Sequence, residues 1–352
     1  MRKRLKIFAL HTTRRTLPAT GGDMINEARF LTALSRFADV YYNGQLFQPG
    51  VPGYGLEDRE IVVPQGGYDL YYVRNNPELF VQLPSPKIVM AYPYVEEVFR
   101  AADAVVVTTE AWERGLTPYS DENMFTRPMR DWYGDDVVAP KRVINIKQTI
   151  DPYFLEEPSR ARLIEARAKT TGAKAIGFFG RIDSNTFPYM FVRAYKQIIK
   201  ELPQVKFVVG GTVRIPLDPT IVKTTRIAYE KMPAMVKACV ATATDEGNDA
   251  AFLGSGKVLD SMACGVPVIA YKTLTRTEQL GDYYPLYYEN EEECCQRIRE
   301  VIHDPDIVAE ARRQMDIRKR HFLPDARAAA LQATLEELVE LRGDTRQKRN
   351  EH

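Results

Sequence analysis

The sequence predicts an α/β protein of two domains, each built around a parallel sheet with crossover helices. Short apolar runs alternate with helical patterns along most of the chain, which is typical of parallel strands joined by helices. This alternation stops in a polar, proline-containing stretch at about residues 150–174 and then starts again. With 352 residues, the chain is long enough to bury two separate cores.

The individual elements follow from apolar runs for strands and from spacings of three and four for helices. In the first half the predicted strands are 6–10, 39–43, 69–74, 87–92, 104–109 and 142–146, and the clearest helix is Met24 to Phe37. In the second half the predicted strands are 175–180, 206–211, 225–230, 240–244 and 267–271, with helices at 188–201 and 257–264. We expect a last helix over 324–342 and a frayed tail. The predicted domains are 1–155 and 156–323, and residues 324–352 form a crossover helix and tail.

The composition excludes several classes of protein. Lys and Arg number 48 against 47 Asp and Glu, a net charge of +1, so there is no overall electrostatic footprint for nucleic acid. No apolar run is long enough to span a membrane. The four cysteines form no CxxC pair, and the four histidines show no metal-ligand spacing. We therefore expect a cytoplasmic protein with reduced cysteines and no bound metal.

One stretch, "GSGKVLDSMACGVPVIAY" at residues 254–271, places a cation where a helix start is already positive. Gly254 and Gly256 allow a ligand to approach the backbone closely, and Ser255 is a plausible N-cap. Lys257 lies in the first turn, where the helix dipole favours an acid, so we expect a bound anion there. Asp260, three residues further, could accept hydrogen bonds from ribose hydroxyls. A capped crossover helix with a solvated Lys–Asp pair is the alternative.

Two further segments are candidate anion sites. Gly21 and Gly22 precede the helix that starts near Met24. Gly180 and Arg181 end the apolar run "FFGRID", and ligands of open α/β sheets bind at the carboxyl ends of strands. A guanidinium at that place can hold a phosphate through two hydrogen bonds. A tight turn explains the first segment equally well, and a surface ion pair explains the second.

Taken together and in this order, the segments resemble the GT-B glycosyltransferases of the GT4-type family (glycosyl transferases group 1). The most specific match is "GKVLDSMACGVPVIAY"; "FFGRID", "TGGDMINEARFLTAL", "ADAVVVTTEAWERGL" and "VINIKQTIDPYF" are similar to other family segments. The resemblance implies two Rossmann-like domains that face an interdomain cleft, with the last helix crossing back to the first domain. It also implies that the second domain binds the nucleotide sugar.

The resemblance assigns roles to individual residues of the second domain. Asp260 takes the place of the ribose-binding acid, and Arg181 that of the pyrophosphate-binding arginine. Phe252 stands where the family's first motif glutamate is expected, which leaves Glu246 as the candidate substitute. Thr186 stands near the place of an expected lysine, so that Lys257 would supply the missing charge.

In the first domain, Gly21 and Gly22 correspond to the loop that approaches the phosphates and the acceptor. Tyr92 stands near the place of the family's usual histidine, and His11 is the nearest imidazole candidate. Glu110 and Tyr92 are the candidates for acceptor contacts.

The implied activity is transfer of a sugar from a nucleotide-diphosphate sugar to a hydroxyl of a glycan, a lipid-linked saccharide or a small molecule. The resemblance implies a retaining, metal-independent reaction, with the nucleotide sugar as co-substrate and no tightly bound cofactor. It leaves open the oligomeric state and a peripheral association with the inner face of a membrane. Two alternatives remain: a degenerate member that binds a nucleotide sugar without turnover, and a nucleotide-sugar epimerase.

Overall fold

The structure, a computed structural model, divides the chain into two compact units. It describes residues 4–11, 22–74, 76–91, 94–116, 138, 140–146, 148–170, 174–184, 186–224, 226–244, 246 and 254–350. The N-terminal unit comprises residues 1–149 and 324–352, and the C-terminal unit comprises residues 150–323.

The first boundary lies a few residues before the expected one at 155. Ile150 and Phe154 are fully buried in the core of the C-terminal unit, and the Ile150 N–H donates to the carbonyl of Phe322 in the same unit. The connecting stretch therefore begins the second domain. The last helix belongs to the N-terminal unit, as the resemblance implied.

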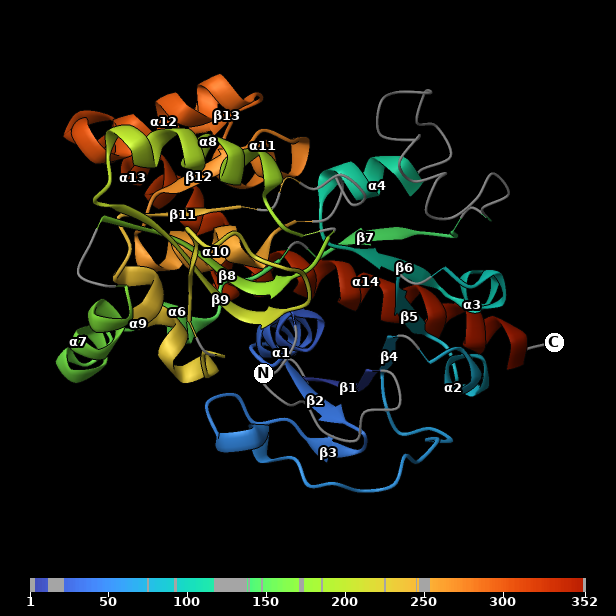
Figure 1. Ribbon diagram of the computed structural model, residues 1–352. Coiled ribbons are helices and arrows are strands. Elements are labelled where there is room, and N and C mark those ends of the chain that lie inside the picture. Colours follow the sequence, from blue (N-terminus) through green and yellow to red (C-terminus); the bar gives the residue numbers. More distant parts are fainter. Residues whose placement is uncertain are drawn as a thin grey trace. The chain divides into compact units, whose positions relative to one another are not determined.

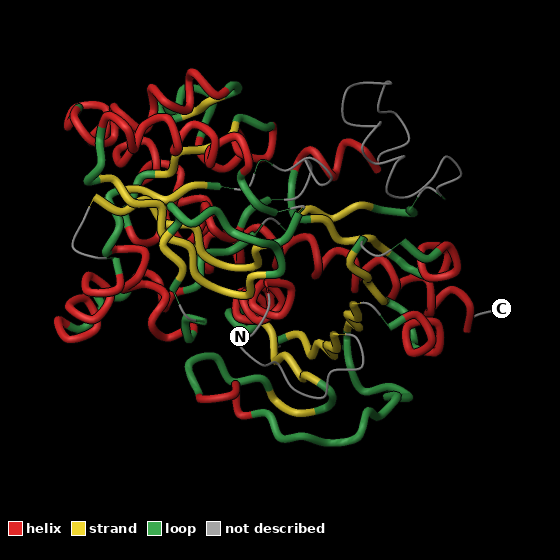
Figure 2. Tube along the Cα trace, viewed as in Figure 1, coloured by secondary structure: helices red, strands yellow, loops and turns green. Residues whose placement is uncertain are grey.

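The N-terminal unit is a sheet of strand order β3-β2-β1-β4-β5-β6-β7, in which all pairings are parallel except β2 with β3. Its strands are β1 (Leu5–His11), β2 (Ala38–Tyr42), β3 (Gln45–Leu46), β4 (Leu70–Arg74), β5 (Lys87–Met90), β6 (Ala104–Val107) and β7 (Val143–Asn145). Its helices are α1 (Gly22–Leu34), the 3-10 turn η1 (Pro52–Gly55), α2 (Pro77–Gln82), α3 (Glu96–Ala101), α4 (Glu110–Leu116) and α14 (Pro324–Asn350). Between β3 and β4 the chain is loop except for η1, as Figure 2 shows.

The C-terminal unit is a parallel sheet of strand order β10-β9-β8-β11-β12-β13. Its strands are β8 (Lys174–Ile182), β9 (Val205–Val213), β10 (Val222–Lys223), β11 (Ala241–Ala243), β12 (Val268–Tyr271) and β13 (Tyr287–Tyr288). Its helices are α6 (Pro152–Leu155), α7 (Arg160–Lys169), α8 (Tyr189–Glu201), η2 (Tyr229–Lys231), α9 (Met232–Lys237), α10 (Gly256–Cys264), α11 (Leu274–Leu280), α12 (Glu291–His303), α13 (Pro305–Lys319) and η3 (Arg320–Phe322). Helices α8 and α12 lie together on one face of the sheet, and α9 and α10 lie on the other (Figure 1).

Three predicted elements differ from the structure. The strand expected at 225–230 is absent from the described part of that range, because Ile227 packs against Gly210 as part of a loop. Residues 222–223 pair with β9 instead. Helix α1 begins at Gly22 rather than Met24, and α14 continues to Asn350 instead of ending near Arg342.

All four cysteines are buried and free of disulfides, and Cys294 and Cys295 lie in α12. Burial raises the pKa of the Cys239 and Cys264 thiols to about 12. These thiols therefore act as small apolar core residues at neutral pH. No helix within the described ranges is long and apolar enough to cross a membrane.

Candidate functional site

The candidate site lies at the carboxyl end of β8, at the point where the C-terminal sheet changes direction. The chain continues from β8 to β9 and β10 on one side, and returns to β11, β12 and β13 on the other. Ligands of open α/β sheets bind outside the strand ends at such a switch point. β8 pairs with β9 along its whole length, but with β11 only at Ile176 and Gly177. Gly180 and Arg181 thus lie beyond the part of β8 that β11 covers.

Two facing glycines shape the end of this strand pair. Gly180 and Gly211 are register partners and have φ angles of +131° and +139°, which residues other than glycine rarely adopt. A Cβ atom on Gly211 would lie 1.9 Å from the carbonyl oxygen of Gly180. Gly211 is therefore required for the backbone beside Arg181. The sequence pattern alone assigned it no role, although a glycine inside a predicted strand signals a close backbone approach.

Arg181 is held by a short turn. Its Nε lies 2.7 Å from Oδ2 of Asp183, and its side chain is 59% exposed. The other oxygen, Oδ1 of Asp183, accepts hydrogen bonds from the backbone N–H and the hydroxyl of Thr186, at 3.1 Å and 3.0 Å. Thr186 thus supports the turn that holds the arginine, at the place where the family pattern has a lysine.

The start of α10 has no acid in its first turn and no cap from its own N-cap side chain. Ser255 has an extended backbone and occupies the N-cap position, but its hydroxyl makes no capping hydrogen bond. The buried amide of Gln279 holds the Ser255 backbone from α11: its Oε1 accepts from the N–H (3.2 Å), and its Nε2 donates to the carbonyl (3.1 Å). Gln279 therefore fixes the loop, a role that the sequence pattern did not indicate.

Lys257 lies against β8 rather than extending into solvent. Its Nζ is 5.0 Å from the centroid of the Phe178 ring, a cation–π geometry. Its Cε would be 3.4 Å from a Cβ atom on Gly180. The fold therefore brings together the glycine–arginine segment and the glycine–lysine segment, which are far apart in the sequence.

The helix predicted at 257–264 packs its apolar residues into the core. Val258, Leu259 and Met262 are fully buried, and Gly265 ends the helix in the left-handed conformation. Asp260 is half-buried on the same helix, one turn after Lys257. Gly254 and Gly256 flank Ser255 at the helix start.

Glu246 lies after β11 and contacts the start of α8. Its two carboxylate oxygens accept hydrogen bonds from the backbone N–H groups of Met190 (2.9 Å) and Phe191 (2.7 Å), and the Tyr288 hydroxyl donates to it at 3.2 Å. Burial raises the pKa of Glu246 above its ordinary value of 4.5, against the lowering effect of these hydrogen bonds. In the structure Glu246 thus acts as a cap for α8.

The candidate residues of the N-terminal unit lie at strand ends and helix starts. His11 is the last residue of β1 and is 1% exposed, and Gly22 is the first residue of α1. Glu110 is the first residue of α4 and forms an ion pair with Arg114 at 3.8 Å. Gly21 and Tyr92 lie outside the described residues.

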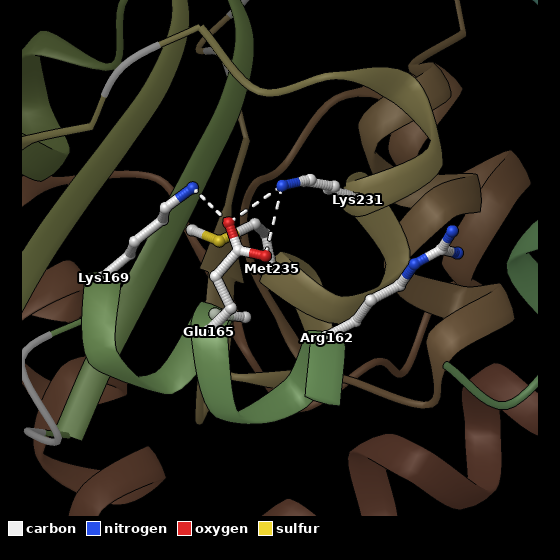
Figure 3. Close-up of a pocket in the computed structure, with 6 residues that line it drawn as sticks. Arg162, Glu165, Lys169, Lys231 and Met235 are labelled. Atoms are coloured by element: carbon white, nitrogen blue, oxygen red, sulfur yellow. Dashed lines mark hydrogen bonds and ion pairs between the residues drawn. The ribbon is translucent and has the colours of Figure 1, made fainter. Parts of the chain in front are cut away.

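A small pocket lies elsewhere on the C-terminal unit, between α7 and α9 (Figure 3). Its volume of about 10 Å³ is room for roughly one water molecule. The Glu165 carboxylate accepts hydrogen bonds from Lys231 at 2.9 Å and Lys169 at 3.0 Å, and these bonds lower its pKa. This pocket is an ion-pair network with no room for a nucleotide. Within the described residues, no three His, Cys, Asp or Glu side chains are grouped closely enough to hold a metal ion.

Part of the chain is similar to a known protein family. Residues 192–333 match the family model described as "Glycosyl transferase-like". This range covers α10 and the strands on both sides of it, but less than half of the chain. No curated protein matches the chain.

Solved structures match nearly the whole chain. HepE from Anabaena, solved with UDP and glucose, is similar at a TM-score of 0.66 and 15% identity, covering 95% of this chain and 100% of that one. Sucrose-phosphate synthase from Thermosynechococcus elongatus is similar at a TM-score of 0.64 and 15% identity, covering 96% and 100%. A trehalose 6-phosphate synthase from Burkholderia multivorans is similar at a TM-score of 0.54 and 13% identity, covering 79% and 72%. At these identities the likeness shows the fold, which is the GT-B fold.

Proposed function

We propose that this protein is a glycosyltransferase that moves a sugar from a nucleotide-diphosphate sugar to a hydroxyl acceptor. The observation that carries the proposal is the approach of Lys257 to Gly180 at the switch point of the C-terminal sheet. The match of residues 192–333 to a glycosyl transferase-like model supports it. So does the structure of HepE in complex with UDP-glucose, which has the same fold.

The electrostatics of this site suit the departure of a nucleoside diphosphate. Cleavage of the sugar–phosphate bond leaves additional negative charge on the diphosphate. Lys257 and the positive end of α10 lie beside Gly180, and Arg181 is the next residue of β8. Preorganised charges of this kind are usually the largest contribution to catalysis. In this proposal the protein's own cations stabilise the leaving group, and Asp260 accepts hydrogen bonds from the ribose hydroxyls.

Asp183 competes with a bound phosphate for the guanidinium of Arg181. The carboxylate already holds Nε of Arg181 at 2.7 Å, so a phosphate has to share the guanidinium or displace the carboxylate. Both side chains reach solvent, and an exposed pair of this kind is worth only about 0–1 kcal/mol. A diphosphate with two negative charges is therefore able to recruit Arg181.

The finer features of the proposal follow the GT4-type resemblance. They are a retaining reaction, no requirement for a metal, and an acceptor that is a glycan, a lipid-linked saccharide or a small molecule. The protein would act in the cytoplasm, and at the inner face of the membrane if the acceptor is lipid-linked. On the acceptor side, His11 and Glu110 are the described candidates.

Nucleotide binding is the first test. We expect one of UDP, GDP, ADP and dTDP to bind best by calorimetry. Lys257→Ala and Arg181→Ala should each lose about 1.5–3 kcal/mol of binding free energy, the usual contribution of a hydrogen bond to a charged group. Lys196→Ala is the matched control and should leave binding unchanged, because Lys196, on the exposed face of α8, forms an ion pair with Asp218. Failure of all four nucleotides to bind the wild type would refute the donor site.

Turnover separates the proposal from its alternatives. We expect the matching nucleotide sugar to be consumed with release of the nucleoside diphosphate and formation of a glycosylated acceptor. Nucleotide binding without any product from an acceptor panel would indicate a degenerate binding protein. Interconversion of two nucleotide sugars would indicate an epimerase.

A further inference from the structure

The N-terminal sheet has a switch point of its own, between β1 and β4. From β1 the chain continues to β2 and β3 on one side, and it later returns to β4, β5, β6 and β7 on the other. The residues at the carboxyl ends of these two central strands are His11 and Arg74, which are register partners. Each sheet therefore has an arginine at the place where ligands of open α/β sheets bind: Arg181 in the C-terminal sheet and Arg74 in the N-terminal sheet.

Arg74 is held by a buried acid on α1. Its Nη1 lies 3.5 Å from Oε2 of Glu27 on α1; the Glu27 side chain is 0% exposed, and that of Arg74 is 15% exposed. The hydroxyl of Tyr72 donates to the same carboxylate oxygen at 2.9 Å. Burial and the neighbouring Glu27 raise the pKa of Tyr72 well above its ordinary range, so that it remains a hydrogen-bond donor.

Stability alone is a poor reason for this arrangement. The ion pair lies in the apolar layer between the sheet and α1, where the rings of Phe30 and Tyr72 meet edge to face at 5.0 Å. Burying two charges costs about as much as their attraction returns, and well-packed apolar residues are often equally stable in such a place. A guanidinium held rigidly at a switch point is better explained by a ligand.

The donors of Arg74 indicate which ligand chemistry fits. Its contact with Glu27 is long, at 3.5 Å from Nη1, and its side chain is 15% exposed. Its Nε is buried, so a ligand can reach only the terminal nitrogens. A guanidinium has five N–H donors in a planar fork that matches a carboxylate or a phosphate. An oxyanion would satisfy donors that Glu27 leaves unused.

We propose that Arg74, oriented by Glu27, binds a carboxylate or phosphate group of the acceptor at the switch point of the N-terminal sheet. That this ligand is the acceptor rests on the proposed glycosyltransferase function; the anion site itself does not. The acceptor is then an acidic or phosphorylated compound, and Arg74 is the residue that selects it over a neutral one.

Calorimetry on the full chain tests the site with three probes: glucose 6-phosphate, glucuronate and glucose. The titrations are made with and without a saturating amount of whichever of UDP, GDP, ADP and dTDP binds best, so that the cations of the donor site are occupied. We expect wild-type protein to prefer one charged sugar over glucose by about 10- to 100-fold, as a charge-assisted hydrogen bond predicts, and Arg74→Gln to abolish that preference. Whichever of glucose 6-phosphate and glucuronate binds more tightly shows whether the site prefers a phosphate or a carboxylate.

Three further variants separate recognition from general damage. Arg74→Lys keeps the charge without the fork and should lose most of the preference. Glu27→Gln keeps an amide oxygen that can still accept from Arg74 but removes the competing charge, and it should strengthen binding of the charged sugar, a change opposite to the effect of misfolding. Arg100→Gln is the matched control, because Arg100 pairs with Glu96 on the exposed face of α3 and should bind like the wild type.

Several outcomes would overturn the proposal: equal affinity of the wild type for charged and neutral sugars, a preference that survives Arg74→Gln, or one that Arg181→Ala removes instead. The last result would mean that the anion occupies the donor site. Failure of UDP, GDP, ADP and dTDP alike to bind would refute the proposed donor site but would leave the anion measurement intact.

Discussion

The starts of α8 and α10 lie at the same edge of the C-terminal sheet, yet the protein treats them in opposite ways. Helix α8 follows β8, and the carboxylate of Glu246 accepts hydrogen bonds from two of its first N–H groups. Helix α10 follows β11; it has no acid in its first turn, its N-cap hydroxyl makes no cap, and Lys257 adds a positive charge. Position at a strand end therefore does not distinguish a helix start that the protein caps from one that we propose to bind a ligand.

This comparison shows that a helix start is available to a ligand only if the protein has not already supplied the anion. At α8 the protein's own carboxylate takes the place that a phosphate would take. At α10 the first turn has no acid and Lys257 adds a positive charge, which suits the binding of a diphosphate. The two helices can be exchanged in this respect by substitution, which leads to three predictions.

The largest effect is expected from Lys257→Glu, which gives α10 an acid in its first turn. We expect the affinity for the preferred nucleoside diphosphate to fall by about 100-fold or more, because a favourable charge is replaced by a repulsive one. Stability should change little, because an acid at a helix start gains about 0.3–1 kcal/mol. Calorimetry and thermal unfolding measure the two quantities. Lys196→Glu makes the same charge change on α8 and should leave the affinity unchanged. An equal loss of affinity in this variant would show that the effect is not specific to α10.

An intermediate effect is expected from Glu246→Ala, which removes the cap of α8. We expect the opening free energy at Met190 and Phe191 to fall by about 1–2 kcal/mol, the usual cost of losing a cap. Hydrogen exchange at these two amides measures it directly. The first turn of α10 should exchange as in the wild type. If Glu246→Ala instead abolished nucleotide binding and left the amides of α8 protected from exchange, Glu246 would be a residue that binds the nucleotide-sugar donor.

The smallest effect is a pH dependence that comes from Glu246. Burial holds its pKa above 4.5 in the folded state, so the folded protein binds more protons than the unfolded chain between 4.5 and that raised value. The free energy of unfolding should therefore decrease as pH rises through this window, and Glu246→Gln should remove this contribution. Denaturation at several pH values in this window measures the free energy of unfolding of both proteins. The same pH dependence in the two would contradict the prediction.

The local properties of the candidate donor site could be predicted from the sequence. Glycines on both sides of Ser255, the apolar spacing of α10 and the helix stop at Gly265 are each encoded within one turn of chain. For the same reason the burial of Val258, Leu259 and Met262 was predictable. The strand at 225–230 was mispredicted because Ile227 packs beside Gly210 as part of a loop, a tertiary contact that periodicity does not record.

By itself, therefore, the sequence determined the α/β class, the two-domain pattern and the segments that contain Arg181 and Lys257. Hydrophobic period and glycine placement act over a few residues, and such features can be read from the chain directly. Only the tertiary structure decided that Lys257 meets Gly180, that Glu246 caps α8, and that Glu27 holds Arg74. Each of these contacts joins different elements of the chain, and strand order and register, rather than local preference, determine which side chains meet.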